Sequence, residues 1–262
     1  MIKISATILT FNEARRIEAC LESLRDIADE IIVVDSGSTD GTLDTCRRYG
    51  CKITVRPLSG FGAQRQYATS LTTYSYVLAI DADEVLSPEL RQSLLTLKAG
   101  EPEHRVYAMS RLNFYCGYAV RHCGWYPDVQ IRLFDKRYAN WNLRDVHERV
   151  IFRDSVRPEP LAGDLLHNRC DEPGEYAATI LHQADIKAGV IAAKNASLTP
   201  LSPTLKGIRA FLHTYIRRRG MLDGTVGFAI SRQQYAGQHH AYSEALRIMK
   251  EARKQNAQPQ HT

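Results

Sequence analysis

The chain has 262 residues, of which 44% are hydrophobic and 24% charged, and its formal net charge is +5. This length suits one large α/β domain or a domain with an appendage, and the composition excludes a disordered or low-complexity protein. No stretch approaches the roughly 18 apolar residues of a membrane-spanning helix, and residues 1–4 do not show the charged-then-apolar pattern expected of a signal peptide. The six cysteines form no CxxC pair and no zinc pattern. We therefore expect a cytoplasmic protein with reduced thiols.

Strands and helices alternate at the start of the chain. Strands are predicted at residues 2–10, 30–35, 52–56 and 76–80, and helices at 13–24, 41–49 and 60–71. The second strand is apolar at every position from 31 to 34, which is typical of a strand covered on both faces, as in a parallel sheet. This order predicts a doubly wound α/β sheet with right-handed crossovers.

The pattern changes after residue 100. Strands are predicted at 106–111 and 130–134, separated by an aromatic loop, and the chain becomes mainly helical from about 172 onwards. We therefore expect residues 1–100 and 101–165 to be two halves of one domain, and 166–262 to be a helical extension.

Carboxylates follow three of the predicted strands. The first strand leads into Thr10 and Glu13, the second ends at Asp35, and the fourth ends at Asp81 and Asp83. In open α/β sheets, ligands bind beyond the carboxyl ends of the strands. Two carboxylates at positions i and i+2 can meet one hard cation, Mg²⁺ or Mn²⁺, which would stabilise a diphosphate leaving group. Helix capping is the structural alternative for such residues, and a DxD pattern alone is a weak signal.

Several nucleotide-binding classes lack their motifs in this chain. No GxGxxG follows the first strand, as a dehydrogenase requires, and no Walker loop occurs. An aspartate-nucleophile phosphatase would have threonine where Val85 stands. A nucleotidyltransferase usually has a glycine-rich loop in place of residues 10–13, which makes it a remote alternative.

Three segments resemble glycosyltransferase family 2 with the GT-A fold. They are ILTFNE at 8–13, IIVVDSGSTDGT at 31–42 and DAD at 81–83. Further segments resemble the bacterial lipopolysaccharide-core β-1,4-glucosyltransferase branch: GFGAQR at 60–65, CGWYPD at 123–128, RLF at 132–134, VHE at 146–148 and RRGMLDG at 218–224.

The resemblance implies roles for individual residues. Thr10, Glu13 and Asp35 would line the nucleoside pocket, and Arg65 would lie near the nucleotide. Asp81 would face the ribose or the metal, and Asp83 would hold the metal on the diphosphate. His147 is a further candidate metal ligand, with a structural histidine as the alternative. Family members transfer with inversion, which requires one general base on the acceptor hydroxyl; Asp128 and Glu148 are both candidates.

The implied reaction moves glucose from UDP-glucose onto a heptose of the lipopolysaccharide inner core. A polyprenyl phosphate or an exopolysaccharide is the alternative acceptor, and a non-catalytic nucleotide-sugar-binding protein is a different class. We expect no nucleic-acid partner. Residues 206–219 combine an apolar stripe with Arg217, Arg218 and Arg219. This segment suits peripheral contact with the inner face of the inner membrane, binding of an anionic acceptor, or packing beneath the main domain.

Overall fold

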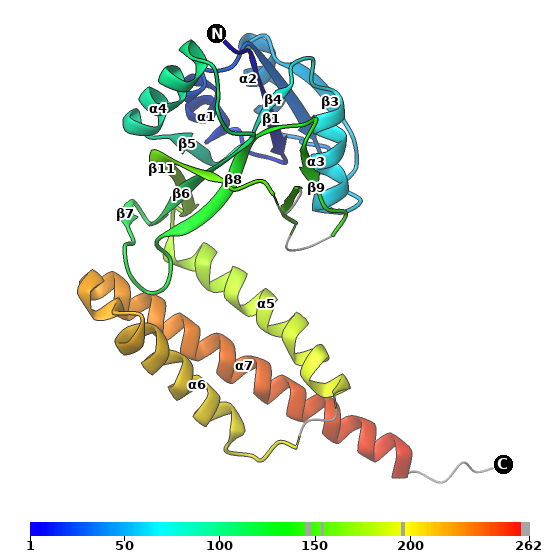
Figure 1. Ribbon diagram of the computed structural model, residues 1–262. Coiled ribbons are helices and arrows are strands. Elements are labelled where there is room, and N and C mark those ends of the chain that lie inside the picture. Colours follow the sequence, from blue (N-terminus) through cyan, green and yellow to red (C-terminus); the bar gives the residue numbers. More distant parts are fainter. Residues whose placement is uncertain (145–147, 153–154, 195–196, 258–262) are drawn as a thin grey trace, which may run out of the picture. The chain divides into compact units, whose positions relative to one another are not determined.

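The computed structural model describes residues 1–144, 148–152, 155–194 and 197–257, with side chains up to residue 252 (Figure 1). The chain forms two compact units. The first contains Met1–Leu112 and Pro127–His167, and the second contains Asn113–Tyr126 and Asn168–Thr262. The aromatic loop therefore belongs to the same unit as the helical part of the chain.

Nine of the strands in the described residues form one mixed sheet, in the order β3-β2-β1-β4-β8-β6-β11-β5 with β7 paired to β6. The parallel half consists of β1 (Ile4–Thr10), β2 (Glu30–Asp35), β3 (Lys52–Val55) and β4 (Tyr76–Asp81). Its register pairs Thr10 with Asp35 and Leu9 with Asp81. The polar strand ends therefore meet at one edge of the sheet, and the predicted GT-A type α/β fold is confirmed.

The antiparallel half adds longer strands than the sequence predicted. It contains β8 (Asp128–Asp135), β6 (Val106–Tyr115), β11 (Glu159–Cys170) and the short β5 (Glu84–Leu86), while β7 spans Tyr118–Ala119. Strand β8 runs antiparallel to β4, and β11 runs antiparallel to β5. A separate hairpin is formed by β9 (Ala139–Trp141) and β10 (Val150–Phe152). Among these, β5, β7, β9, β10 and β11 were not predicted.

Helices cover both faces of the sheet (Figure 1). Helices α1 (Ile17–Ser23), α2 (Thr42–Arg48) and α4 (Pro88–Ala99) share one apolar core with β1 and β4, in which Ile8, Leu21 and Leu90 are fully buried. On the other face, α3 (Phe61–Ser70) places Ala68 against Ile32 of β2. Helix α1 begins later than predicted, because residues 13–16 form a turn. Helix α4 was not predicted, although Ser87 caps it and proline opens it.

The second unit confirms the predicted helical extension. Helices α5 (Pro173–Ala193) and α6 (Ser202–Leu212) both pack against α7 (Gly224–Ala257). Two short helical turns, η1 (His213–Arg217) and η2 (Gly220–Asp223), connect α6 to α7. No helix of the described residues is both long and apolar enough to cross a membrane.

Candidate functional site

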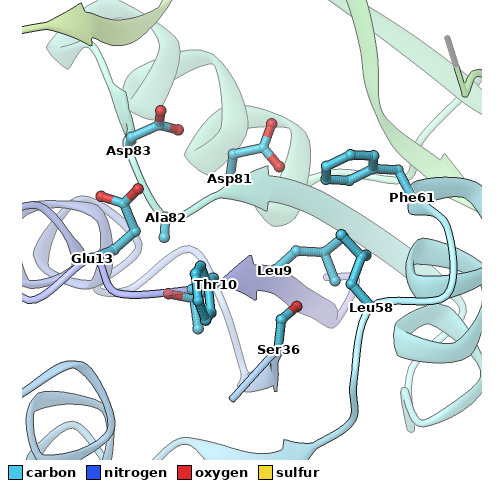
Figure 2. A pocket seen from close by; sticks show the side chains of 10 residues that line it. Leu9, Thr10, Glu13, Ser36, Leu58, Phe61, Asp81, Ala82 and Asp83 are labelled. Carbon is cyan, nitrogen blue, oxygen red and sulfur yellow. The ribbon is translucent and has the colours of Figure 1, made fainter. Parts of the chain in front are cut away.

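A cavity of about 390 Å³ lies at the carboxyl ends of β1, β2 and β4 (Figure 2). It is lined by Leu9, Thr10, Phe11, Glu13, Ser36, Leu58, Phe61, Asp81, Ala82 and Asp83. The structure thus brings together four residues that the sequence singled out: Thr10, Glu13, Asp81 and Asp83. The volume suits a small organic ligand held between apolar walls and a few polar groups.

The Thr10 hydroxyl is a buried polar group beside this cavity. The residue is 4% exposed, and its Oγ1 has no hydrogen-bond partner among the described residues. Buried hydroxyls nearly always have a partner, and leaving one unpaired is costly. A ligand in the cavity can supply the missing hydrogen bond.

Asp35 is fully buried and does not line the cavity. Its Oδ1 accepts hydrogen bonds from the backbone N–H groups of Gly37 (2.9 Å) and Ser38 (2.8 Å), and its Oδ2 accepts one from the Ser38 hydroxyl. The carboxylate therefore shapes the loop after β2, and the neighbouring Ser36 is the residue of that loop that reaches the cavity.

Asp83 faces a histidine that the sequence analysis missed. The Nε2 atom of His167 lies 3.2 Å from Oδ2 of Asp83, and both side chains are partly buried. His167 comes from β11, where it pairs with Glu84 of β5. A carboxylate and an imidazole both bind Mn²⁺, and a divalent ion bound to a nucleotide takes its other ligands from phosphates and water.

His147, the other histidine proposed as a metal ligand, lies outside the described residues. Among the described residues, no group of three or more histidine, cysteine, aspartate or glutamate side chains is arranged to hold a metal ion. Asp83 and His167 therefore fit a metal ion that takes its further ligands from a bound substrate.

Glu13 lies close to Asp83 in the cavity (Figure 2). Burial, together with the charge of Asp83, raises the pKa of the Glu13 carboxyl.

Asp81 is held by two arginines. Its Oδ1 accepts from Nη2 of Arg65 (2.7 Å) and its Oδ2 from Nη2 of Arg132 (2.9 Å). Burial by itself would raise the pKa of Asp81, but the two guanidinium charges outweigh it and hold that pKa well below its usual range. Both carboxylate oxygens thus already have cationic partners, so Asp81 is less suited than Asp83 to direct metal coordination.

The two candidate bases lie at opposite ends of a chain of ion pairs that includes Asp81. At one end, Nε of Arg65 donates to Oε1 of Glu148 at 3.0 Å. At the other end, Arg111 donates from both Nε and Nη2 to Oδ2 of Asp128, at 2.9 and 2.7 Å. Neither carboxylate lines the cavity itself.

Glu84 joins the two halves of this chain. Its Oε1 accepts from Nη1 of Arg111 (3.1 Å) and from Nη2 of Arg132 (2.9 Å). The side chain of Glu84 is fully buried and that of Arg132 nearly so. The sequence analysis assigned no role to Glu84, Arg111 or Arg132, although the segment containing Arg132 carried part of the family resemblance.

The sequence model of the family described as Glycosyl transferase family 2 matches residues 5–157, which is more than half of the chain. The chain belongs to this family. A relative described as an uncharacterized glycosyltransferase, from Rickettsia felis, is 31% identical over 254 residues, which cover 88% of this chain and 85% of the relative. The resemblance drawn from the sequence motifs is therefore confirmed at the level of the family.

This chain is also similar to a protein from Rhizobium meliloti described as the lipopolysaccharide core biosynthesis glycosyltransferase LpsC. It is 31% identical over 174 residues, 64% of each chain. A solved structure of glucosyl-3-phosphoglycerate synthase from Mycobacterium tuberculosis, with Mn²⁺ and UDP-glucose, is 26% identical and covers 43% of this chain and 44% of that chain. Its TM-score is 0.35.

Proposed function

We propose that this glycosyltransferase moves glucose, with inversion, from UDP-glucose to a heptose of the lipopolysaccharide inner core. The observation that carries the proposal is the Asp83–His167 pair at the edge of the cavity that Thr10 and Asp81 line. The likeness to LpsC supports a lipopolysaccharide-core acceptor, and the motif resemblance supports the sugar nucleotide.

In this proposal, Asp83 and His167 would hold Mg²⁺ or Mn²⁺, which would supply positive charge to the diphosphate leaving group. The Thr10 hydroxyl binds the nucleoside, and Ser36, in the loop after β2, lines the same cavity. Asp81 accepts a hydrogen bond from a ribose hydroxyl, while Arg65 and Arg132 fix the orientation of the Asp81 carboxylate. The apolar side chains of Leu58 and Phe61 form part of the wall and exclude water.

We assign the general base to Asp128. Each candidate pairs with an arginine, but the Asp128 side chain is 30% exposed and its partner Arg111 19%, whereas the Glu148 side chain is 18% exposed and its partner Arg65 only 6%. An acceptor hydroxyl needs an accessible carboxylate that can take its proton as the sugar is transferred. Glu148 then serves to hold Arg65 in place.

The surface of α6 supports a peripheral membrane location. Five exposed apolar residues follow one another at helical spacing from the start of α6 into η1: Leu201, Leu205, Ile208, Leu212 and Ile216. Exposed arginines at 209 and 217–219 lie in the same segment. An apolar stripe beside basic residues binds an interface that carries anionic lipid. An acceptor anchored in the inner leaflet would be presented at such a surface.

A panel of nucleotide sugars tests the proposal. We expect UDP-glucose with Mn²⁺ to raise the thermal unfolding midpoint more than UDP-galactose, GDP-mannose or dTDP-glucose. We also expect glucose transfer to lipopolysaccharide truncated at the heptose, and none to polyprenyl phosphate. Stabilisation by a different nucleotide sugar, or transfer to polyprenyl phosphate instead, contradicts the donor or the acceptor assignment respectively.

A further inference from the structure

Glu84 is a fully buried carboxylate just after the Asp81–Asp83 turn, and all its described partners belong to that turn or to two arginines. Its Oε2 accepts from the backbone N–H of Asp81 at 2.9 Å. Its Oε1 is shared between Arg111 and Arg132. One side chain thus fixes the backbone from which Asp83 extends and the two guanidinium groups beside it.

Each of these arginines also donates hydrogen bonds to a second carboxylate. Arg132 reaches Oδ2 of Asp81 at 2.9 Å, and Arg111 grips Oδ2 of Asp128 with two N–H groups. The carboxylates of Glu84 and Asp81 raise the pKa of Arg132 although burial alone would lower it. Without the negative charge of Glu84, the repulsion between the guanidinium groups of Arg111 and Arg132 would be less well compensated. Like charges repel strongly where water is excluded.

We propose that Glu84 is a positioning residue for transfer: through Arg111 it sets the place of Asp128, and through the Asp81 backbone and Arg132 it sets the place of the carboxylates at the cavity. This inference rests on the proposed function. Glu84 does not line the cavity, so it acts on the reaction only through these partners.

Glu84→Gln tests the proposal because it keeps the shape of the side chain. A glutamine amide has one acceptor oxygen and one NH₂ group, so it cannot accept from the Asp81 N–H and from both arginines at once. We expect kcat to fall by about 10- to 100-fold, since a displacement of about 1 Å in a reacting group costs this much. The dissociation constant of UDP with Mn²⁺ should rise by a smaller factor than kcat falls, because Asp81 is still held by Arg65 and by its pairing with β1, whereas Arg111 loses part of its link to Glu84.

Glu89→Gln is the matched control, because Glu89 is an exposed glutamate in the first turn of α4, and it should leave both quantities unchanged. Arg111→Lys is a second variant, in case Glu84→Gln does not fold. Lysine keeps the charge but lacks the planar guanidinium group that binds Glu84 and Asp128 at the same time, so kcat should fall in the same way.

A spectroscopic measurement is independent of catalysis. The Nε–H group of Arg111 donates to Asp128, so its NMR signal should be protected from exchange in the wild type and lost or shifted in Glu84→Gln. An unchanged Arg111 signal, or a kcat within about 3-fold of wild type in both variants, overturns the positioning role. Failure of the wild type to bind UDP or to transfer glucose contradicts the proposed function instead, and the NMR comparison still tests the position of Arg111.

Discussion

His167 lies opposite Asp83, with its Nε2 atom 3.2 Å from Oδ2 of the carboxylate, although 84 residues separate the two in the chain. The antiparallel pairing of β11 with β5 brings the two together, because its register pairs His167 with Glu84, the residue next to Asp83 in the chain.

Replacing His167 by alanine tests its role as a metal ligand. We expect the Mn²⁺ concentration that half-activates transfer to rise by at least about 10-fold, because one of two protein ligands is lost. His104→Ala is the control, since His104 is a half-buried histidine of the same unit that pairs with Glu159. Equal Mn²⁺ dependence in His167→Ala and wild type contradicts the assignment.

Thr10→Val removes the buried hydroxyl that has no described partner while keeping the shape of the side chain. We expect UDP affinity to fall by about 5- to 10-fold, as for the loss of one hydrogen bond, with no loss of stability. Calorimetric titration and thermal unfolding measure the two effects. Thr7→Val is the control on the same strand, because Thr7 is buried but does not line the cavity. An equal affinity loss in both variants argues against a nucleoside contact by Thr10.

Asp128→Asn and Glu148→Gln separate the two candidate bases. At saturating donor we expect Asp128→Asn to reduce turnover by at least about 100-fold, since general-base catalysis contributes this much. Glu148→Gln should reduce turnover less. It weakens the ion pair that positions Arg65, and Arg65 in turn orients Asp81. Single-turnover kinetics distinguish slow chemistry from slow product release. The reverse order of effects would assign the base to Glu148.

Glu13 gives a prediction for stability against pH. Burial and the Asp83 charge raise the pKa of Glu13, so the folded chain binds its proton more tightly than the unfolded chain does. Ionisation of Glu13 therefore destabilises the fold as pH rises through that pKa. Glu13→Gln should raise the unfolding midpoint at pH 7 by about 1–3 °C, and the gain should vanish near pH 4.

Thermal unfolding scans between pH 4 and pH 8 measure this gain. Glu18→Gln is the control, because Glu18 is an exposed glutamate in α1, the helix that follows Glu13 in the chain. A Glu13→Gln protein that is less stable than wild type at pH 7 contradicts the linkage argument, and shows instead that the pair of Glu13 with Arg16 dominates.

The membrane proposal is tested by Leu205→Asp combined with Ile208→Asp. Both side chains are exposed on α6, so the fold should tolerate the change while sedimentation with phosphatidylglycerol vesicles falls. Ile186→Asp on α5 is the matched control, since Ile186 is also an exposed apolar residue. If all variants sediment equally with these vesicles, α6 is not the membrane-binding surface.

The parallel half of the sheet could be predicted from the sequence because its strands are short, apolar runs separated by amphipathic helices. Strands β5 and β11 could not, since β5 has three residues and β11 mixes polar and apolar residues without a clean alternation. Their pairing is a long-range property of the fold. The sequence therefore gave no reason to connect His167 with Asp83.

The candidate site was predicted in part. Thr10, Glu13, Asp81 and Asp83 lie together because the ends of parallel strands meet at one edge of the sheet. Arg111, Arg132 and Glu84 are charged residues of strands, and only the fold reveals that both arginines pair with the fully buried Glu84. Sequence patterns record residue type and spacing, whereas the burial of a charge and the identity of its partner are properties of the folded chain.

Calorimetric titration of UDP-glucose in the presence of Mn²⁺, for the wild type and Asp83→Asn, tests most directly whether the cavity is a metal-assisted nucleotide-sugar site. We predict that the wild type binds UDP-glucose with Mn²⁺ and loses at least about 10-fold in affinity when EDTA replaces the metal. Asp83→Asn should show the weak affinity in both conditions while its unfolding midpoint stays near that of the wild type. Equal binding by wild type and Asp83→Asn in the presence of Mn²⁺ would contradict the account.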